Sequence, residues 1–250
     1  MGPVERKVVG QAKRNTLCFV LIDSESLSTS KAAEMAGRAQ GAGAAAILVG
    51  GSSAVDQIEL NNVVASIKTA VDIPVILFPG NVTGISPKAD AILFSSLLNS
   101  ENPYFITGAQ ALGALAVKKH DIEAIPMAYL IIGEGSSVWF IGRARGIPFD
   151  KPNLAVMYAL AAQYMGMRSL YLEAGSGASS HVQPKMVVAV RNNFNGLLIV
   201  GGGIRDAKTA REIAKAGADV IVVGTMFEKG PDKSLKTIIR AIRSARRIKR

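Results

Sequence analysis

Residues 169–180 read SLYLEAGSGASS, and this stretch decides the fold. Its first five residues form a short, mostly apolar run, which is typical of a strand buried in a parallel sheet. The run ends in a single carboxylate, Glu173, and a turn of glycines and hydroxyls follows at once. A strand that leads through a glycine turn into a helical pattern is one unit of an α/β fold. The number of such units therefore determines the architecture.

Strand-like runs of this kind recur along the whole chain, with helical patterns between them. The runs lie at 17–22, 45–50, 74–78, 91–94, 126–132, 169–173, 197–201 and 220–224. The helical patterns lie at 30–42, 54–70, 103–119, 153–166, 180–194 and 206–216, with a last one from 232. Eight alternations of strand and helix predict an α/β fold, a (β/α)8 TIM-type barrel. A chain of 250 residues suits one such barrel, so we expect a single domain over 1–250.

One unit of the barrel departs from the pattern. Only twelve residues, 79–90 (PGNVTGISPKAD), separate the third and fourth strand-like runs, and three breakers interrupt them. That length is too short for a crossover helix. We therefore expect the third helix to be missing and a groove to open on that flank.

Local signals mark helix ends and one long loop. Asn102 before Pro103 and Asp206 after GGGIR are good helix N-caps, and Gly217 is a helix stop. The longest irregular segment, 133–151, carries the only tryptophan, Trp139. Long loops in compact domains are usually functional or interfacial, so we expect an interface, lid or core role for Trp139 and a small hairpin in the loop.

Composition and charge narrow the function classes. The lone cysteine, Cys18, sits in an apolar run, the residues MGPVERK (1–7) lack the apolar core typical of a signal peptide, and no apolar stretch is long enough to span a membrane. These features predict a soluble, cytoplasmic protein. The formal charge of +10 favours anionic partners such as phosphates, nucleic acid or a bilayer surface. Aromatic interleaving and zinc-ligand spacing are absent, which argues against nucleic acid. The basic C-terminal residues predict a solvated helix or contact with lipid headgroups; they are Arg240, Arg243, Arg246, Arg247, Lys249 and Arg250.

The predicted active site lies where the strands end. In this architecture the loops after the strands form the site, so Glu173 should face the barrel mouth and accept a proton from a substrate hydroxyl. The adjacent turn at 175–177 offers backbone N–H groups to an anion, and so do GGGIR (201–205) and VGT (223–225). A small molecule with both a hydroxyl and a phosphate would satisfy the carboxylate and the turns together. The alternatives are glycines needed only for tight turns and a structural ion pair for Glu173.

A metal site is expected at the end of the first strand. Asp23 follows that strand, and Ser52 follows the second. Carboxylate and hydroxyl oxygens suit Mg²⁺, which usually shares its shell with substrate phosphates and water. Asp and Ser are also ordinary helix N-caps after a strand, and that alternative stays open.

Several longer motifs together resemble a known family. These are AAILVGGS (45–52), SSLLNSENPYFITGAQ (95–110), IPMAYLIIGEG (125–135), YLEAGSGA (171–178), GGGIR (201–205) and VVGT (222–225). In this order, and over nearly the whole chain, they resemble the archaeal geranylgeranylglyceryl phosphate synthases. Those enzymes are modified barrels without the third helix, in agreement with the short segment 79–90.

The resemblance implies a reaction and a set of site residues. It implies Mg²⁺-dependent transfer of a geranylgeranyl group from its diphosphate to the 3-hydroxyl of sn-glycerol 1-phosphate, the first ether bond of archaeal lipids. It also implies Glu173 as the catalytic base, metal binding by Asp23 and Ser52, a prenyl tail in the groove, and a homo-oligomer, either a dimer or a hexamer. The residues implied for glycerol 1-phosphate are Tyr171, Leu172, Glu173, Ala174, Gly175, Ser176, Gly177, Gly202, Gly203, Gly224 and Thr225.

The sequence departs from this family pattern at the first strand. Relatives often follow the aspartate with a proline and a nearby lysine, whereas this chain has Asp23-Ser24-Glu25-Ser26. Another basic residue or Mg²⁺ must then balance the diphosphate. The open alternatives are a longer prenyl donor and a different phosphate-binding barrel, such as a sugar-phosphate isomerase or synthase.

Overall fold

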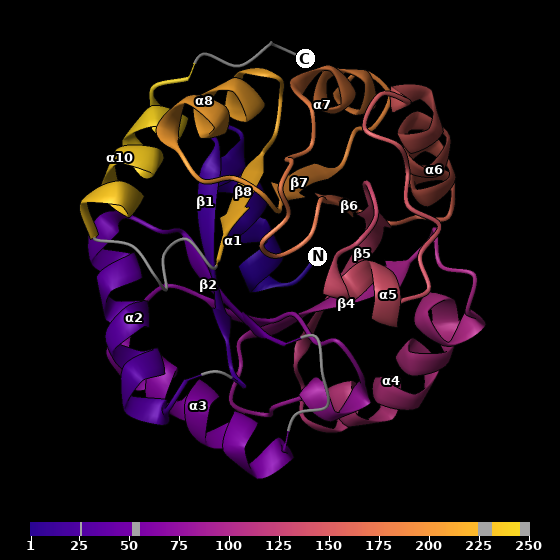
Figure 1. Ribbon diagram of the computed structural model, residues 1–250. Coiled ribbons are helices and arrows are strands. Elements are labelled where there is room, and N and C mark those ends of the chain that lie inside the picture. The colour runs from indigo at the N-terminus through magenta and orange to yellow at the C-terminus, as the bar shows by residue number, and fades with distance from the viewer. Residues whose placement is uncertain (26, 52–55, 225–231, 246–250) are drawn as a thin grey trace.

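The strands close into a parallel barrel (Figure 1). The computed structural model describes residues 1–25, 27–51, 56–224 and 232–245. Each strand pairs in parallel with the next one along the chain, and the last pairs with the first, so the predicted (β/α)8 barrel is confirmed. The strands are β1 (Leu17–Asp23), β2 (Ala46–Gly50), β3 (Val75–Leu77), β4 (Ala91–Leu97), β5 (Glu123–Ile131), β6 (Ser169–Glu173), β7 (Leu197–Gly201) and β8 (Val220–Val223).

Helices form a ring around the strands in Figure 1. Asp206 caps one of them as expected, since its side chain accepts a hydrogen bond from the Thr209 N–H at 2.8 Å, and Gly217 follows the end of the same helix with φ +110°. The helices are α1 (Pro3–Ala12), α2 (Thr29–Ala42), α3 (Gln57–Ala70), α4 (Ala109–Lys119), α5 (Ser137–Ile141), α6 (Pro152–Tyr164), α7 (Pro184–Arg191), α8 (Ala207–Lys215) and α10 (Asp232–Arg243).

The helix expected to be missing is absent. Between β3 and β4 the chain forms only a short 3-10 turn, η1 (Val82–Gly84), which contacts both α3 and α4. A π-helical turn, η2 (Tyr104–Gly108), precedes α4, and Asn102 accepts a hydrogen bond from the Tyr104 N–H at its start, 3.0 Å away. One flank of the barrel is therefore covered by short turns instead of a full helix.

Helix α1, which the sequence analysis did not predict, covers the N-terminal ends of the strands. The Glu123 carboxylate accepts hydrogen bonds from the backbone N–H groups of Val4 and Glu5, at 2.7 and 2.8 Å. Arg168 donates two hydrogen bonds to the buried Glu5 carboxylate, at 2.8 and 2.7 Å. Val8 of the same helix packs against the apolar interior of the barrel. The end of the barrel opposite the predicted site is thus closed.

The loop after β5 contains a helix in place of the expected hairpin, so that expectation is wrong. Ser136 caps this short helix, α5, by accepting a hydrogen bond from the Trp139 N–H at 3.3 Å. Local capping outweighs strand pairing here, and only isolated bridges form, such as Ile132 with Ile147. Trp139 is partly buried against the barrel interior. Helix α7 begins at Pro184 and not at 180, because proline fits the first helical turn but not its interior.

The lone cysteine and the last helix are packing elements. Burial raises the pKa of the Cys18 thiol to about 12, so the thiol stays protonated. In α10, Arg243 donates a hydrogen bond to the Gly43 carbonyl at 2.9 Å, which ties the helix to the end of α2. The rest of the basic cluster, from 246 onward, lies outside the described residues. Among the helices that the structure describes, none is long and apolar enough to cross a membrane.

Candidate functional site

The alternation of side chains along β6 aims Glu173 into the barrel. Leu170 and Leu172 pack between the strands and the helices, whereas Tyr171 packs in the barrel interior. Because side chains of a strand alternate between its faces, Glu173 shares the face of Tyr171. The same rule places Asp23 on the face of Phe19, which lies in the interior at the start of β1.

A large pocket lies at the carboxyl ends of the strands. Its volume is about 1020 Å³, at the upper end of the range of ligand sites, roughly 300–1,000 Å³. The separate glycine turns meet there as the sequence predicted, with the carboxylate beside them. The residues that contribute are Glu173, Ser176, Gly177, Gly202, Gly203 and Gly224.

Glu173 is a buried carboxyl group that accepts hydrogen bonds from two neighbouring donors. It is 6% exposed, and its Oε1 accepts a hydrogen bond from the Gly175 N–H at 2.5 Å. Burial raises the pKa of Glu173 above its usual value, although hydrogen bonds from the Tyr171 hydroxyl and the Gly175 N–H act in the opposite direction. A carboxylate with a raised pKa is a stronger base than a solvated one. This environment suits removal of a proton from a bound hydroxyl.

Gly202 must be a glycine because of its contact with Glu173. Its φ is +80°, and a Cβ there would lie 2.3 Å from Glu173 Oε1 and 2.5 Å from the Gly175 nitrogen. Gly203 has φ +68°, and a Cβ there would lie 2.3 Å from the Ser180 carbonyl oxygen. Glycine is the residue that allows such backbone conformation and close approach together. The turn after β7 is therefore packed directly on the turn after β6.

Three aromatic rings form the floor of the pocket. The ring centroids of Phe78, Tyr129 and Tyr171 are 5.3–5.4 Å apart, and all three residues line the pocket. Sequence reasoning missed Phe78 and Tyr129 as site residues. The available signal was that Phe78 ends the predicted strand at 74–78, whereas Tyr129 lies in the middle of the predicted strand at 126–132. Burial, with the nearby Glu173 adding to it, raises the pKa of both Tyr129 and Tyr171, so both hydroxyls stay protonated.

One side of the pocket is apolar and lies on the flank where the helix is missing. Val82 and Ile85 line it from the segment around η1, and Phe105 and Ala109 line it from η2 and α4. Ile141 of α5 also contributes. The predicted groove is thus continuous with the site around Glu173.

The expected metal site is only partly described. Asp23 lines the pocket and accepts a hydrogen bond from the Glu25 N–H at 2.9 Å. A Cβ on Gly51 would lie 3.2 Å from Asp23 Oδ1 and 2.5 Å from Glu25 Oε1, so two carboxylates flank one point of the rim. Ser52 lies outside the described residues, and so does Thr225. The described side chains include no group of three or more His, Cys, Asp or Glu able to hold a metal.

Three described residues of the predicted acceptor site, Leu172, Ala174 and Gly175, are not among those that line the pocket, and the Gly175 N–H is already donated to Glu173. Leu172 and Ala174 belong to the apolar cluster between the barrel and its helices. The Ala174 N–H donates to the Gly201 carbonyl at 3.1 Å. Both residues support the position of Glu173 through the backbone of β6 and its turn.

Comparison with known proteins agrees with this site. The model of the PcrB family matches residues 11–242. The geranylgeranylglyceryl phosphate synthase of Nitrosopumilus maritimus is 61% identical over 235 residues, which cover 94% of each chain. The crystal structure of (S)-3-O-geranylgeranylglyceryl phosphate synthase from Thermoplasma acidophilum, in complex with sn-glycerol-1-phosphate, has a TM-score of 0.94 at 39% identity and covers 97% of this chain and 99% of its own. The chain therefore belongs to the PcrB family, alongside the archaeal geranylgeranylglyceryl phosphate synthases.

Proposed function

We propose that this chain transfers a geranylgeranyl group from geranylgeranyl diphosphate to the 3-hydroxyl of sn-glycerol 1-phosphate. The observation that carries the proposal is the position of Glu173. Its buried carboxylate lies between the glycine turns and the apolar flank of one pocket. A phosphate on the turns and a prenyl tail on the flank would bring the hydroxyl and the prenyl carbon together beside this base. Family relatives bear the name of this activity.

The acceptor side of the reaction follows from the glycine turns. Backbone N–H groups in turns of this kind form concave anion sites. Their donors would hold the phosphate and leave the 3-hydroxyl near Glu173. The hydroxyl oxygen forms a bond to the first prenyl carbon, the bond from that carbon to the diphosphate oxygen breaks with its electron pair, and Glu173 takes the hydroxyl proton. Holding the reacting groups in place supplies a large part of the rate enhancement.

We propose that Asp23 helps to hold Mg²⁺. The carboxylates of Asp23 and Glu25 at one point of the rim are the hard oxygen ligands that this ion prefers. When bound, Mg²⁺ would neutralise charge that develops on the departing diphosphate. Ser52, the next residue in the sequence after Gly51, is proposed as a second ligand of the ion.

A transfer assay tests the function. We expect purified protein with labelled geranylgeranyl diphosphate, Mg²⁺ and sn-glycerol 1-phosphate to form the ether product, and expect little product from sn-glycerol 3-phosphate. Removal of Mg²⁺ with a chelator should stop the reaction. Failure to form an ether with any prenyl diphosphate would disprove the proposal.

The chain length of the preferred prenyl donor is tested separately, because a longer prenyl donor is the open alternative. Geranyl, farnesyl, geranylgeranyl and heptaprenyl diphosphate are compared at matched concentrations. We expect the highest kcat/KM for geranylgeranyl diphosphate. Preference for the heptaprenyl donor would instead support the longer-chain alternative.

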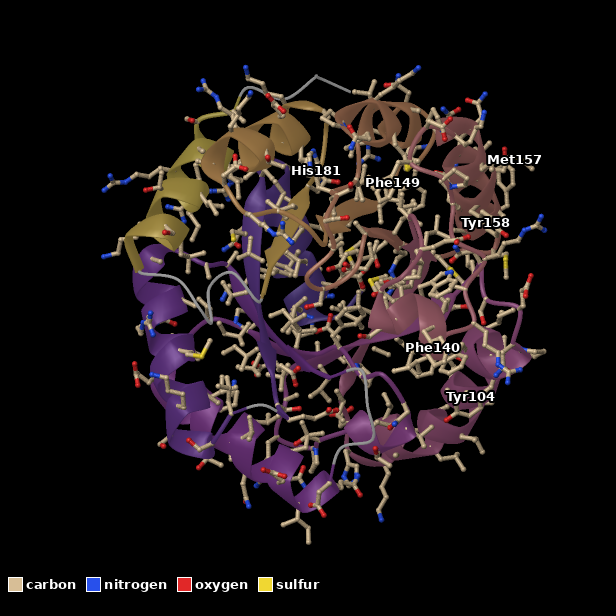
Figure 2. The ribbon with its side chains drawn as sticks, viewed as in Figure 1. Tyr104, Phe140, Phe149, Met157, Tyr158 and His181 are labelled. Carbon is tan, nitrogen blue, oxygen red and sulfur yellow. The ribbon has the colours of Figure 1, made fainter. Side chains whose placement is uncertain are left out.

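We further propose a cytoplasmic homo-oligomer, a dimer or a hexamer. Phe140 of α5 and Met157 of α6, both labelled in Figure 2, are 74% and 64% exposed. Tyr164 and Met165, at the end of α6, are 80% and 63% exposed. Large apolar side chains that gather on a surface often mark an interface. Light scattering coupled to gel filtration gives the oligomeric state, and a monomer at all concentrations would contradict the proposal.

A further inference from the structure

Arg205 is a cation at the phosphate end of the pocket. It follows β7 in the turn that leads to α8, and it is exposed to solvent. Among the described residues that line the pocket, Arg205 is the only one with a cationic side chain. The pocket is proposed to receive two phosphorylated substrates, so the position of this charge bears on substrate binding.

The Arg205 guanidinium joins the loop after β7 to the loop after β6. Its Nη2 donates hydrogen bonds to the carbonyl oxygens of Gly177 and Ala178, at 3.0 and 2.7 Å. Both bonds use one of the three guanidinium nitrogens. An arginine has five N–H donors in a planar fork, so further donors lie on Nη1 and Nε. The side chain is thus able to hold a loop and face an anion at the same time.

The loop held by Arg205 is the one that carries the glycine turn. Gly175 and Gly177 have φ values of +105° and +70°, and the Ala178 N–H closes the turn on the Gly175 carbonyl at 3.2 Å. Between the end of β6 and the start of α7 at Pro184, the chain forms no helix or strand. Such a segment lacks the regular hydrogen-bond ladder that fixes an element. The two bonds from Arg205 supply part of that constraint, because they fix the carbonyls of Gly177 and Ala178 at the end of the turn that would bind the phosphate.

We propose that Arg205 is a positioning residue for the acceptor phosphate, which holds the 175–178 turn in its anion-binding shape and adds positive charge beside it. This inference rests on the proposed function, since it assigns the turn to sn-glycerol 1-phosphate. The donor tail, on the opposite flank of the pocket, is independent of Arg205.

Steady-state kinetics of Arg205→Ala, Arg205→Lys and Arg211→Ala test the proposal. For Arg205→Ala we expect the KM for sn-glycerol 1-phosphate to rise roughly tenfold, since hydrogen bonds from charged groups are worth about that factor or more. We expect kcat to fall much less and the KM for the prenyl donor to stay unchanged. Arg205→Lys keeps the charge and should recover part of the loss. Arg211→Ala removes the same charge from an exposed position of α8 and should match the parent protein.

Phosphate binding gives a readout that does not depend on turnover. Calorimetric titration with inorganic phosphate should show weaker binding to Arg205→Ala than to the parent protein and to Arg211→Ala. Equal phosphate affinity and an unchanged acceptor KM would overturn the inference, and so would an equal loss in Arg211→Ala. If the parent protein binds phosphate through Arg205 but transfers no prenyl group, the proposed function fails and the role of Arg205 in anion binding stands.

Discussion

Glu173 acquires its chemistry from its surroundings. A carboxyl group at the end of a solvated strand would be a weak base at neutral pH. Here the neighbouring turns exclude water, so burial raises the pKa, while the Gly175 N–H and the Tyr171 hydroxyl keep the ionised form accessible. The raised pKa brings the group closer to neutral pH, where a general base works best.

Replacing Glu173 with glutamine should slow transfer and preserve the fold. We expect Glu173→Gln to reduce the rate constant of the transfer step by about 10²-fold or more, because a general base typically contributes that much. Glutamine keeps an acceptor for the Gly175 N–H, so the thermal midpoint should not fall. The measurement is single-turnover transfer with both substrates saturating. Turnover equal to that of the parent protein would exclude the base role.

The pH dependence follows from the direction of the pKa shift. Activity should rise with pH as Glu173 loses its proton, with a midpoint above the ordinary carboxyl pKa, and Glu173→Gln should lack this limb. The raised pKa also means that the folded state binds this proton more tightly than the unfolded state. The contribution of Glu173 to the unfolding free energy is therefore fully present below its unfolded pKa, falls as the pH rises, and is lost once the pH exceeds its folded pKa. Denaturant melts of Glu173→Gln and the parent protein compare their unfolding free energies at acid and at alkaline pH. The difference should favour the variant more at alkaline pH. An equal difference at both pH values would contradict the raised pKa.

Asp23 should set the magnesium requirement. We expect Asp23→Asn to raise the Mg²⁺ concentration that gives half-maximal activity, because a neutral amide binds the ion more weakly than a carboxylate. A titration of initial rate against Mg²⁺ measures this change. Asp150→Asn, which alters a well-exposed carboxylate, serves as the control for net charge. Identical titrations for Asp23→Asn and the parent protein would remove Asp23 as a ligand.

At the scale of elements, strands were predicted better than short helices. Each strand is a run of apolar residues buried on both sides, and that pattern is visible without tertiary information. Helix α1 was missed because its ten residues are mostly polar or small and it is stabilised by distant partners, Glu123 and Arg168. The hairpin expected in the loop after β5 was wrong because the capping by Ser136 and the burial of Trp139 favour α5. These contacts are absent from any local pattern.

The apolar flank should control use of the donor tail. Ala109 of α4 lines this side, whereas Leu112 of the same helix is 67% exposed and points away from the pocket. We expect Ala109→Phe to reduce kcat/KM for geranylgeranyl diphosphate by about tenfold or more, because overfilling a packed site typically costs 1–3 kcal/mol. The shorter geranyl diphosphate should be affected less. Leu112→Phe is the matched control, and an equal effect of both substitutions on both donors would argue against a tail site on this flank.

At the scale of the whole molecule, the two ends of the barrel have separate roles. The carboxyl ends of the strands carry the pocket, and the amino ends carry buried ion pairs. Arg191 donates hydrogen bonds to Asp219 at 2.8 Å and to the Gly196 carbonyl at 3.1 Å, and Asp219 also accepts from the Leu198 N–H. Both side chains are almost fully buried. This end of the barrel therefore contributes to stability.

Breaking that ion pair should lower stability without changing catalysis. Arg191→Met leaves the Asp219 carboxylate buried without its cation, and we expect the unfolding free energy to fall by about 3–5 kcal/mol. Urea denaturation measures the change. At a temperature where the variant is folded, both KM values should match those of the parent protein. Arg211→Met should stay within about 0.5 kcal/mol, as exposed substitutions usually do, and an equally small effect of Arg191→Met would show that the buried pair contributes little.

The position of the site was predictable from the sequence because strand order and alternation determine it. Glu173 ends an apolar run, and the glycine turns follow other strands of the same barrel, so their meeting follows from closure of the sheet. The hydrogen bonds from Arg205 to the Gly177 and Ala178 carbonyls were not predictable, because a contact between a side chain and a carbonyl depends on loop conformation. The outward position of Leu172 follows from the alternation along β6, which the motif alone does not reveal.

The aromatic floor and helix α1 together make the barrel a blind tube. Phe78, Tyr129 and Tyr171 occupy its axis beneath Glu173, and α1 seals the far end, so everything that enters must return through the same mouth. The ether product would keep its phosphate on the glycine turns and its prenyl group along the apolar flank. These are the positions that the next acceptor and the next donor must occupy. The departure of the product must precede the next cycle. Turnover should then depend on how readily a bilayer or a detergent micelle draws the amphiphile out.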